Sequence, residues 1–162
     1  MVRSPCRASR IKEPPLPSSC RYGPRFMMPD TLRLLCVDDE EQILKTLERF
    51  CHNEGITLLT AGSADEALSI LEQQPVMIVI SDYQMPEKNG LEFLHDVRNK
   101  WPQIVRIMLS GFIEPEMVAQ ALQRGEIFGF LPKPWQRADL KNLIRSAADQ
   151  YQAETVSERT SL

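Results

Sequence analysis

The chain has 162 residues, of which 43% are hydrophobic, so it is long enough for one compact domain with a buried core, and we do not expect a second folded domain. Its net charge of −3 is unevenly distributed, because residues 1–29 carry six basic side chains against the single acid Glu13, a balance of +5 that leaves −8 for residues 30–162. An acidic domain lacks the basic surface that neutralises phosphates, and no apolar run approaches the roughly 20 residues of a membrane span, so we expect a cytoplasmic protein that binds neither nucleic acid directly nor a membrane.

The first 30 residues differ in composition from the rest of the chain. They hold six of the 12 prolines, together with serine and arginine, and have almost no aliphatic residues. Such a segment cannot bury enough apolar surface to offset its chain entropy, so we predict that this basic segment is disordered. Met27 or Met28 would start the chain a few residues before the first strand, and we favour a mis-assigned start over a functional basic arm.

From Thr31 onward, short apolar runs alternate with patterns of helical period. The first helix has an apolar face that includes Leu47 and Phe50, and Gly55 closes it. Short runs buried on both faces, with helices between them, indicate a doubly wound parallel sheet. The strands are predicted at 34–37, 56–61, 76–80, 104–109 and 127–131.

The remaining helices have recognisable ends. A capping box at 63–66 opens the second helix, and Asn89-Gly90 turns the chain into the third. The fourth spans about 115–124, and the apolar stripe of the last helix ends at Tyr151. The pattern predicts five helices, followed by a polar tail over 152–162.

Polar side chains stand where four of the apolar runs stop. Asp38 and Asp39 follow the first run, Asp82 follows the third, Ser110 follows the fourth, and Lys133 lies just past the fifth. Doubly wound sheets place their ligand crevice at the carboxyl ends of the strands, so we expect these side chains to converge. Three neighbouring carboxylates repel one another, and Mg2+ prefers hard oxygen ligands. The cluster therefore predicts a magnesium site.

Four short motifs share this order with a known family. They are Asp38-Asp39, the turn Asp82-Tyr83-Gln84-Met85-Pro86, Leu109-Ser110-Gly111 and Lys133-Pro134. The chain resembles the receiver domains of two-component response regulators over about residues 31–151. The resemblance implies a flavodoxin-like α/β fold, with a five-stranded parallel sheet of order 2-1-3-4-5 and five helices. Only a polar tail follows Tyr151, so we expect a regulator of the single-domain type.

The resemblance assigns a role to each polar residue of the site. Asp82 is expected to accept a phosphoryl group from a histidine kinase or a phosphotransfer protein. Mg2+ is expected to bind Asp39 directly, Asp38 partly through water, Asp82, and the backbone carbonyl of Gln84. The ammonium of Lys133 would stabilise charge on the transferred group. The protein would then be a phosphoacceptor whose own chemistry is limited to self-phosphorylation from small donors and self-dephosphorylation.

Two further features of the family concern the response to phosphorylation. Ser110 is expected to move its hydroxyl toward the new phosphoryl group, which leaves room for Phe130 to rotate inward. A core phenylalanine that stays buried in both states is an equally weighted interpretation of Phe130. The resemblance also implies a cis peptide bond between Lys133 and Pro134.

The output surface in the family is formed by the fourth helix, fifth strand and fifth helix. Here it would display Glu114, Gln120, Arg124, Trp135 and Arg137. Trp135 is a candidate anchor for an unknown downstream protein, although packing against the base of the last helix explains it as well. Lys133-Pro134-Trp135 resembles receivers that are joined to cyclic-dinucleotide phosphodiesterase or hybrid-kinase modules. Phosphorylation-dependent homodimerisation stays open.

Two other functions are compatible with part of the pattern. A pseudo-receiver would bind its partners regardless of phosphate, and the complete set of polar residues argues against it. A Mg2+-dependent aspartyl phosphatase would also place an Asp nucleophile at a strand end. That interpretation requires a second Asp two residues after the nucleophile, and the residue two positions after Asp38 is Glu40.

Overall fold

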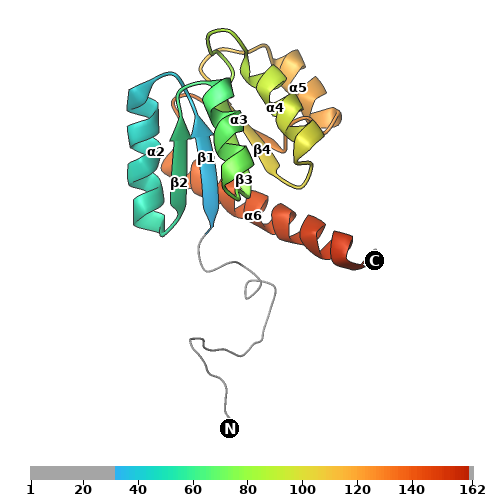
Figure 1. Ribbon diagram of the computed structural model, residues 1–162. Helices are drawn as coiled ribbons and strands as arrows, with labels where there is room; N and C mark the ends of the chain where they lie inside the picture. Colours follow the sequence, from blue (N-terminus) through green and yellow to red (C-terminus); the bar gives the residue numbers. More distant parts are fainter. Residues whose placement is uncertain (1–31, 161–162) are drawn as a thin grey trace. The chain divides into compact units, whose positions relative to one another are not determined.

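A computed structural model describes residues 32–160 of the chain, and the side chains as far as residue 155 (Figure 1). Five parallel strands form one sheet in the order β2-β1-β3-β4-β5, which confirms the predicted fold class. The strands are β1 (Arg33–Val37), β2 (Thr57–Ala61), β3 (Ile78–Asp82), β4 (Val105–Ser110) and β5 (Gly129–Pro132). The predicted disorder and start site fall on residues 1–30 and lie outside the described part.

Five helices connect and cover the strands. They are α2 (Glu41–Glu54), α3 (Ala64–Gln73), α4 (Gly90–Lys100), α5 (Pro115–Gln123) and α6 (Arg137–Thr160). Helix α2 packs on β1 and β2, and α6 packs on β3, β4 and β5, while α3 and α4 contact each other as well as the sheet. No helix in the described range is long and apolar enough to cross a bilayer.

The central strands are buried on both faces, as their continuous apolar runs predict. Every residue of β3 is buried, and so are four of the five residues of β1. Phe93 on α4 is the largest fully buried side chain. Burial of a side chain of this size contributes about 2–3 kcal/mol, so the strands at the centre of the sheet form a rigid support for the residues that follow them.

Helix ends follow from local hydrogen bonding, with one difference from prediction. Gly55 ends α2 in a left-handed conformation (φ 71°), as expected. Ser63 accepts a hydrogen bond from the Glu66 backbone N–H, but the Glu66 carboxylate accepts from Gly62 rather than from Ser63. The complete capping box instead belongs to α4, where Asn89 and the residue three positions later bond reciprocally.

Several element boundaries also differ from the sequence prediction by one or two residues, for example β3, which spans Ile78–Asp82 instead of 76–80, and two further differences have a visible cause. Strand β5 begins at Gly129 rather than at 127, because the Arg106 side chain binds the carbonyls of Gly125 and Glu126 and holds the approach to β5. Helix α6 continues to Thr160, through the segment expected to be a polar tail. No Gly or Pro occurs within 137–160, so nothing in the local sequence stops the helix where its apolar stripe ends.

Candidate functional site

The polar side chains that follow the strands meet at one edge of the sheet. Strand β1 leads into Asp38, β3 ends in Asp82, β4 ends in Ser110, and Lys133 follows β5. The pairing register sets them side by side, since Asp82 lies opposite Leu109 and Ser110 opposite the last residue of β5. Strands β1 and β3 are neighbours at which the chain changes direction along the sheet, and this switch point is where doubly wound folds bind ligands.

Lys133 joins the carboxylates of this edge. Its Nζ lies 2.8 Å from Oδ2 of Asp38 and 3.2 Å from Oδ1 of Asp82, and its side chain is only 13% exposed. A weaker contact of 3.5 Å reaches Oε1 of Glu40. The Lys133–Pro134 peptide bond is cis. One ammonium therefore serves three carboxylates from two segments that are far apart in the sequence.

The electrostatics of the two buried carboxylates show that this single ammonium is not enough. Burial raises the pKa of Asp38, against hydrogen bonds from Lys133 and the Glu40 backbone that lower it. Burial and then the charge of Asp38 raise the pKa of Asp82, although Lys133 acts in the opposite direction. For Lys133, burial alone would lower the pKa, but its contacts with the two aspartates outweigh burial and raise it. The site therefore favours additional positive charge.

A divalent cation fits these donors. Carboxylate oxygens of Asp38, Glu40 and Asp82 all lie within 4.8 Å of one another, and oxygens are the ligands that Mg2+ prefers. Asp39, which we expected to bind the metal directly, is exposed and is not part of this group. The backbone of Gln84 is two residues from Asp82, on the loop that leaves β3. The structure thus adds Glu40 to the acidic residues of the site.

Ser110 is buried and its hydroxyl is turned toward the loop after β4. The Oγ donates a hydrogen bond to the carbonyl of Phe112 at 3.0 Å and accepts one from the Phe112 N–H at 3.1 Å. The backbone N–H of Lys133 donates to the carbonyl of Ser110 at 2.9 Å. Ser110 and Lys133 are therefore held next to each other, and the Ser110 hydroxyl bonds only to the backbone of Phe112 among the hydrogen bonds of the described residues.

The backbone of α4 lies against the phosphoacceptor candidate itself. The Gly90 N–H donates to the carbonyl of Tyr83 at 2.8 Å. A Cβ at position 90 would lie 2.2 Å from the carbonyl oxygen of Asp82 and 2.9 Å from the Cα of Tyr83. Only glycine permits this approach. From the sequence, Asn89-Gly90 indicated a turn, and its contact with Asp82 depends on tertiary structure that no local pattern shows.

The fold, the strand-end cluster and the order of its residues agree with one protein family. The family model for the response regulator receiver domain matches residues 34–145. The chain belongs to this family. Receiver domains are phosphoacceptors of two-component systems and generally act without being enzymes, so the phosphatase alternative has no support from the comparison.

Curated relatives of this receiver domain are longer regulators and a kinase. The hydrogenase transcriptional regulatory protein HoxA of Cupriavidus necator is 38% identical over 116 residues, which cover 72% of this chain and 24% of the relative. Sensor kinase CckA of Brucella abortus is 34% identical, with 72% of this chain and 12% of the relative covered. The chain thus spans about a quarter, or less, of the length of these relatives.

Solved structures of receiver domains have the same fold. The signal receiver domain of an HD domain-containing protein from Pseudomonas fluorescens is 31% identical, with a TM-score of 0.72. The alignment covers 76% of this chain and 98% of the Pseudomonas fluorescens chain. A receiver domain protein from Clostridium thermocellum is 28% identical, with a TM-score of 0.71 and coverages of 75% and 98%.

The residues expected on the output surface have different environments. Trp135 and Phe130 are half-buried, and Phe130 packs against the core. Arg137 donates a hydrogen bond to Glu54 on α2 at 2.8 Å, and its guanidinium lies over the ring of Phe50. Arg137 therefore links two helices, whatever else it contacts. Exposed positions on or beside α5 are Glu114, Gln120, Arg124, Phe112, Met117 and Leu122.

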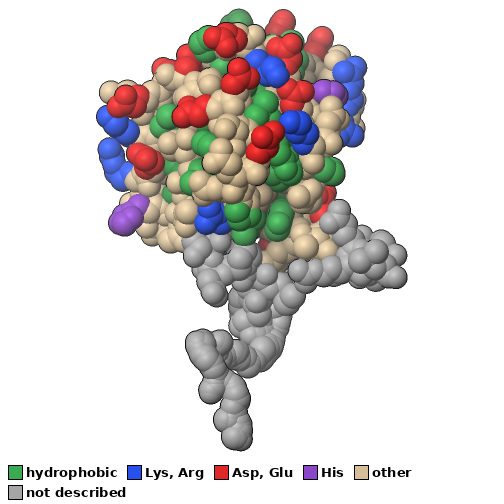
Figure 2. Space-filling model, in the orientation of Figure 1, with side chains coloured by type: hydrophobic (Ala, Val, Ile, Leu, Met, Phe, Trp, Pro, Cys, Tyr) green, Lys and Arg blue, Asp and Glu red, His purple; other side chains and the backbone are tan. Residues whose placement is uncertain are grey.

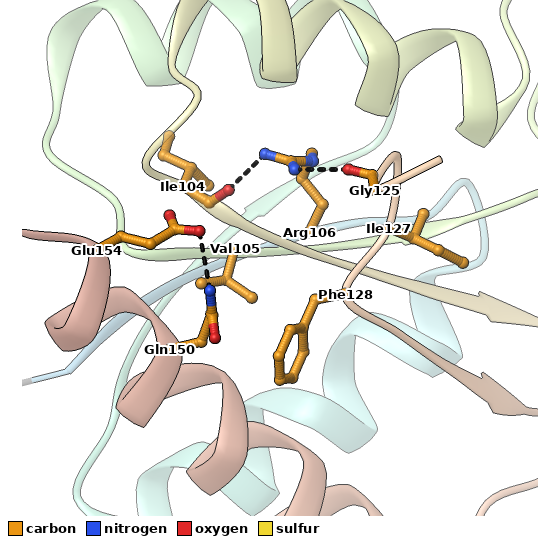
Figure 3. A pocket seen from close by; sticks show the side chains of 8 residues that line it. All are labelled: Ile104, Val105, Arg106, Gly125, Ile127, Phe128, Gln150 and Glu154. Atoms are coloured by element: carbon orange, nitrogen blue, oxygen red, sulfur yellow. Dashed lines mark hydrogen bonds between the residues drawn. The ribbon is translucent and has the colours of Figure 1, made fainter. Parts of the chain in front are cut away.

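A cavity of about 150 Å3 lies at the other end of the sheet, where β4 and β5 begin (Figure 3). The Arg106 guanidinium donates to the carbonyls of Ile104 and Gly125, and Gln150 of α6 donates to Glu154. Burial lowers the pKa of Arg106, whose bonded partners are backbone carbonyls. The Arg106 contacts fasten the approach to β5 to strand β4, the Gln150 contact lies within α6, and the residues that line the cavity do not include those of the strand-end cluster.

Proposed function

We propose that Asp82 accepts a phosphoryl group from a histidine kinase or a phosphotransfer protein, with Mg2+ bound at the same site, and that the modified domain then signals through its surface. The observation that carries this proposal is the position of Lys133, whose ammonium lies between the buried carboxylates of Asp38 and Asp82. That position is where charge on the oxygens of a transferred phosphoryl group has to be stabilised.

The chemistry assigned to Asp82 is an in-line displacement. An Oδ of the ionised carboxylate forms a bond to phosphorus, while the bond from phosphorus to the leaving nitrogen of the donor histidine breaks and the imidazole keeps the electron pair. Lys133 stays within reach of the equatorial oxygens. The contact of Gly90 with the Asp82 backbone keeps the nucleophile in register with the ammonium, and such positioning supplies much of the catalysis in phosphoryl transfer.

The metal would be held by Asp38, Asp39, Asp82 and the backbone carbonyl of Gln84, as the resemblance implies. Mg2+ supplies charge neutralisation for the phosphoryl oxygens when it is bound. The raised pKa values of Asp38 and Asp82 support this assignment, because they show that the carboxylates lack compensating positive charge. Asp39 is the side chain that has to turn inward, since it is exposed in the structure.

The switch is proposed to start at Ser110. Its hydroxyl now bonds to the Phe112 backbone, and a phosphoryl group on Asp82 would offer stronger, charged acceptors. Movement of the hydroxyl toward Asp82 would break both bonds to Phe112 and release the loop that leads into α5. Phe130 lies on the adjacent strand and is half-buried, so it can respond to the vacated space.

The output surface is assigned to α5, β5 and the start of α6. Helix α5 buries only Ala121, and Met117 and Leu122 are 36% and 43% exposed. Phe112, at 75% exposure, joins this apolar surface to the Ser110 loop. Trp135 and Arg137 stay candidate contacts for a downstream protein. Homodimerisation on phosphorylation, the single-domain type, the Lys-Pro-Trp variety and the cytoplasmic location also stay predictions.

The test is covalent labelling of the purified full chain. The protein is incubated with acetyl phosphate and Mg2+ and weighed by intact mass spectrometry, beside Asp82→Asn, the exposed control Asp65→Asn and a sample with EDTA. We expect one phosphate adduct on the native chain and on the Asp65 variant, and none on the Asp82 variant or without metal.

The absence of an adduct, together with failure to bind beryllofluoride, would contradict the proposal and favour a phosphate-independent interaction domain. Steady release of phosphate by catalytic amounts of protein would instead revive the phosphatase.

A further inference from the structure

Glu40 is the N-cap residue of α2, but its side chain contacts the site instead of capping the helix. It precedes α2 with an extended backbone (φ −94°, ψ 110°), and its side chain makes no capping hydrogen bond. Its backbone N–H donates to Oδ1 of Asp38 at 2.8 Å, which ties the residue to the site. The side chain is 63% exposed, and its Oε1 lies 3.5 Å from Nζ of Lys133. The carboxylate therefore faces the ammonium from the solvent side.

The charge of Glu40 is poorly neutralised. Lys133 is closer to Asp38 (2.8 Å) and Asp82 (3.2 Å), and both of those carboxylates are buried. A Glu40 oxygen lies within 4.8 Å of oxygens from both aspartates. Figure 2 shows acidic side chains gathered along the upper edge of the molecule, above the ends of the strands in Figure 1. Glu40 is the exposed member of these three carboxylates, so an incoming phosphodonor reaches the buried Asp82 within range of its charge.

We propose that Glu40 selects the phosphodonor by charge: it disfavours small dianionic acyl phosphates relative to phosphoramidates, the chemical class to which a phosphohistidine belongs. The inference rests on the proposed function of Asp82 as the phosphoacceptor. Repulsion between a fixed carboxylate and a donor grows in proportion to the negative charge of the donor. Acetyl phosphate is a dianion near neutral pH, whereas phosphoramidate carries a protonated nitrogen and is a monoanion overall.

The phosphoryl transfer forms one bond to phosphorus and breaks one with either donor. An Asp82 Oδ forms an O–P bond in each case. With acetyl phosphate the P–O bond to the acyl oxygen breaks, and acetate leaves with the electron pair. With phosphoramidate the P–N bond breaks, and the protonated nitrogen leaves as ammonia. Glu40 forms and breaks no bond, so its effect is confined to the approach and placement of the donor.

The experiment compares Glu40→Gln with the native chain and with Glu41→Gln. The first variant removes the charge and keeps an oxygen that can accept from Lys133. Glu41 is the matched control, because it is exposed and pairs with Lys45, outside the site. Second-order labelling rates are measured by intact mass with each donor, at saturating Mg2+ and low ionic strength.

Glu40→Gln should raise the rate with acetyl phosphate about fivefold and the rate with phosphoramidate about twofold. The increase in rate with acetyl phosphate is close to the square of the increase with phosphoramidate, as expected if the repulsion energy is proportional to the negative charge of the donor. Added salt should bring the labelling rates of the native chain and of Glu40→Gln closer together, since the Debye length is about 10 Å at 0.1 M and the repulsion is screened. Glu41→Gln should change neither rate by more than about 1.5-fold.

A second measurement separates donor selection from metal binding. The charge of Glu40 also attracts Mg2+, so calorimetric titration should show Mg2+ binding by Glu40→Gln weakened by no more than about tenfold, as expected for the loss of one nearby charge beside a dication. A larger loss of Mg2+ affinity would make Glu40 a metal ligand and overturn the inference. The inference would also be overturned if Glu40→Gln changed the labelling rates with the two donors by the same factor, or if Glu41→Gln changed them as much as Glu40→Gln does. If no variant forms an adduct that needs Asp82, the proposed function fails first, and the inference fails with it.

Discussion

Replacement of Gly90 by alanine should damage both the fold and the site. The added Cβ would lie 2.2 Å from the carbonyl oxygen of Asp82, about 1 Å inside the ~3.3 Å at which carbon and oxygen normally touch. The Cα of Tyr83, at 2.9 Å, is also too close. Both neighbours are backbone atoms, so no change of side-chain rotamer relieves the overlap, and α4 has to move away from the end of β3.

The magnitude follows from the cost of overpacking a buried position. Overpacking costs about 1–3 kcal/mol, and the gain from replacing glycine in a helix returns less than about 1 kcal/mol. We therefore expect Gly90→Ala to lower the free energy of unfolding by about 2 kcal/mol in urea titrations. Labelling of Asp82 with phosphoramidate should slow at least tenfold, because a shift of about 1 Å at the nucleophile costs about a hundredfold in other enzymes.

Gly62→Ala is the matched control. A Cβ at position 62 would meet only the end of the Glu66 side chain, at 3.6 Å, which is an ordinary contact. The free energy of unfolding of this variant should lie within about 0.5 kcal/mol of the native value, and Asp82 should be labelled at the native rate. If Gly90→Ala matched that behaviour in both assays, α4 would not rest on the Asp82 backbone, and the positioning role of Gly90 would be wrong.

Three further substitutions test separate parts of the structure. Asp82→Asn should raise the free energy of unfolding in metal-free buffer at pH 7, because burial and the charge of Asp38 raise the pKa of this carboxyl. This gain should shrink as the pH falls and vanish below the unfolded pKa of about 3.9, where the carboxyl is protonated in both states. Urea titrations at several pH values check this. Asn89→Ala should lower the urea midpoint by an amount equivalent to about 1 kcal/mol, because it removes the capping box of α4. Arg137→Ala should cost less than about 1 kcal/mol in the same assay, since its bond to Glu54 is exposed, and a larger loss would mean that the pair supports the base of α6.

The fold was predictable because its signals are local and repeated. Apolar runs of strand length alternate with helical patterns, and each strand found in the structure overlaps its predicted range. Most strand boundaries shift by one or two residues, and the two errors with a visible cause lie where a distant side chain or an absent signal decides the boundary. Strand β5 starts late because Arg106 reaches across to the carbonyls before it, and α6 runs on because helix propensity persists beyond the apolar stripe.

The site was predictable only in its strand-end residues. Asp38, Asp82, Ser110 and Lys133 each interrupt or follow an apolar run, and parallel topology brings such residues together. Glu40 was not predicted as part of the site, because nothing in a run of acidic residues shows which side chain turns toward a lysine that lies 93 positions away. Gly90 was hidden for a similar reason, since its neighbour is the backbone of another element.

These residues share a physical property that helps to mark the site. Asp38 and Asp82 are buried without enough positive charge, so their ionised forms lower the stability of the domain until a cation or a proton compensates them. A buried cluster with this cost would be replaced by neutral side chains if stability alone decided the sequence. Any ligand that supplies positive charge to the cluster must in turn stabilise the folded state, because binding and folding are linked. The same imbalance that draws a cation into the site therefore ties its occupancy to the stability of the surrounding strands and of the Ser110 loop.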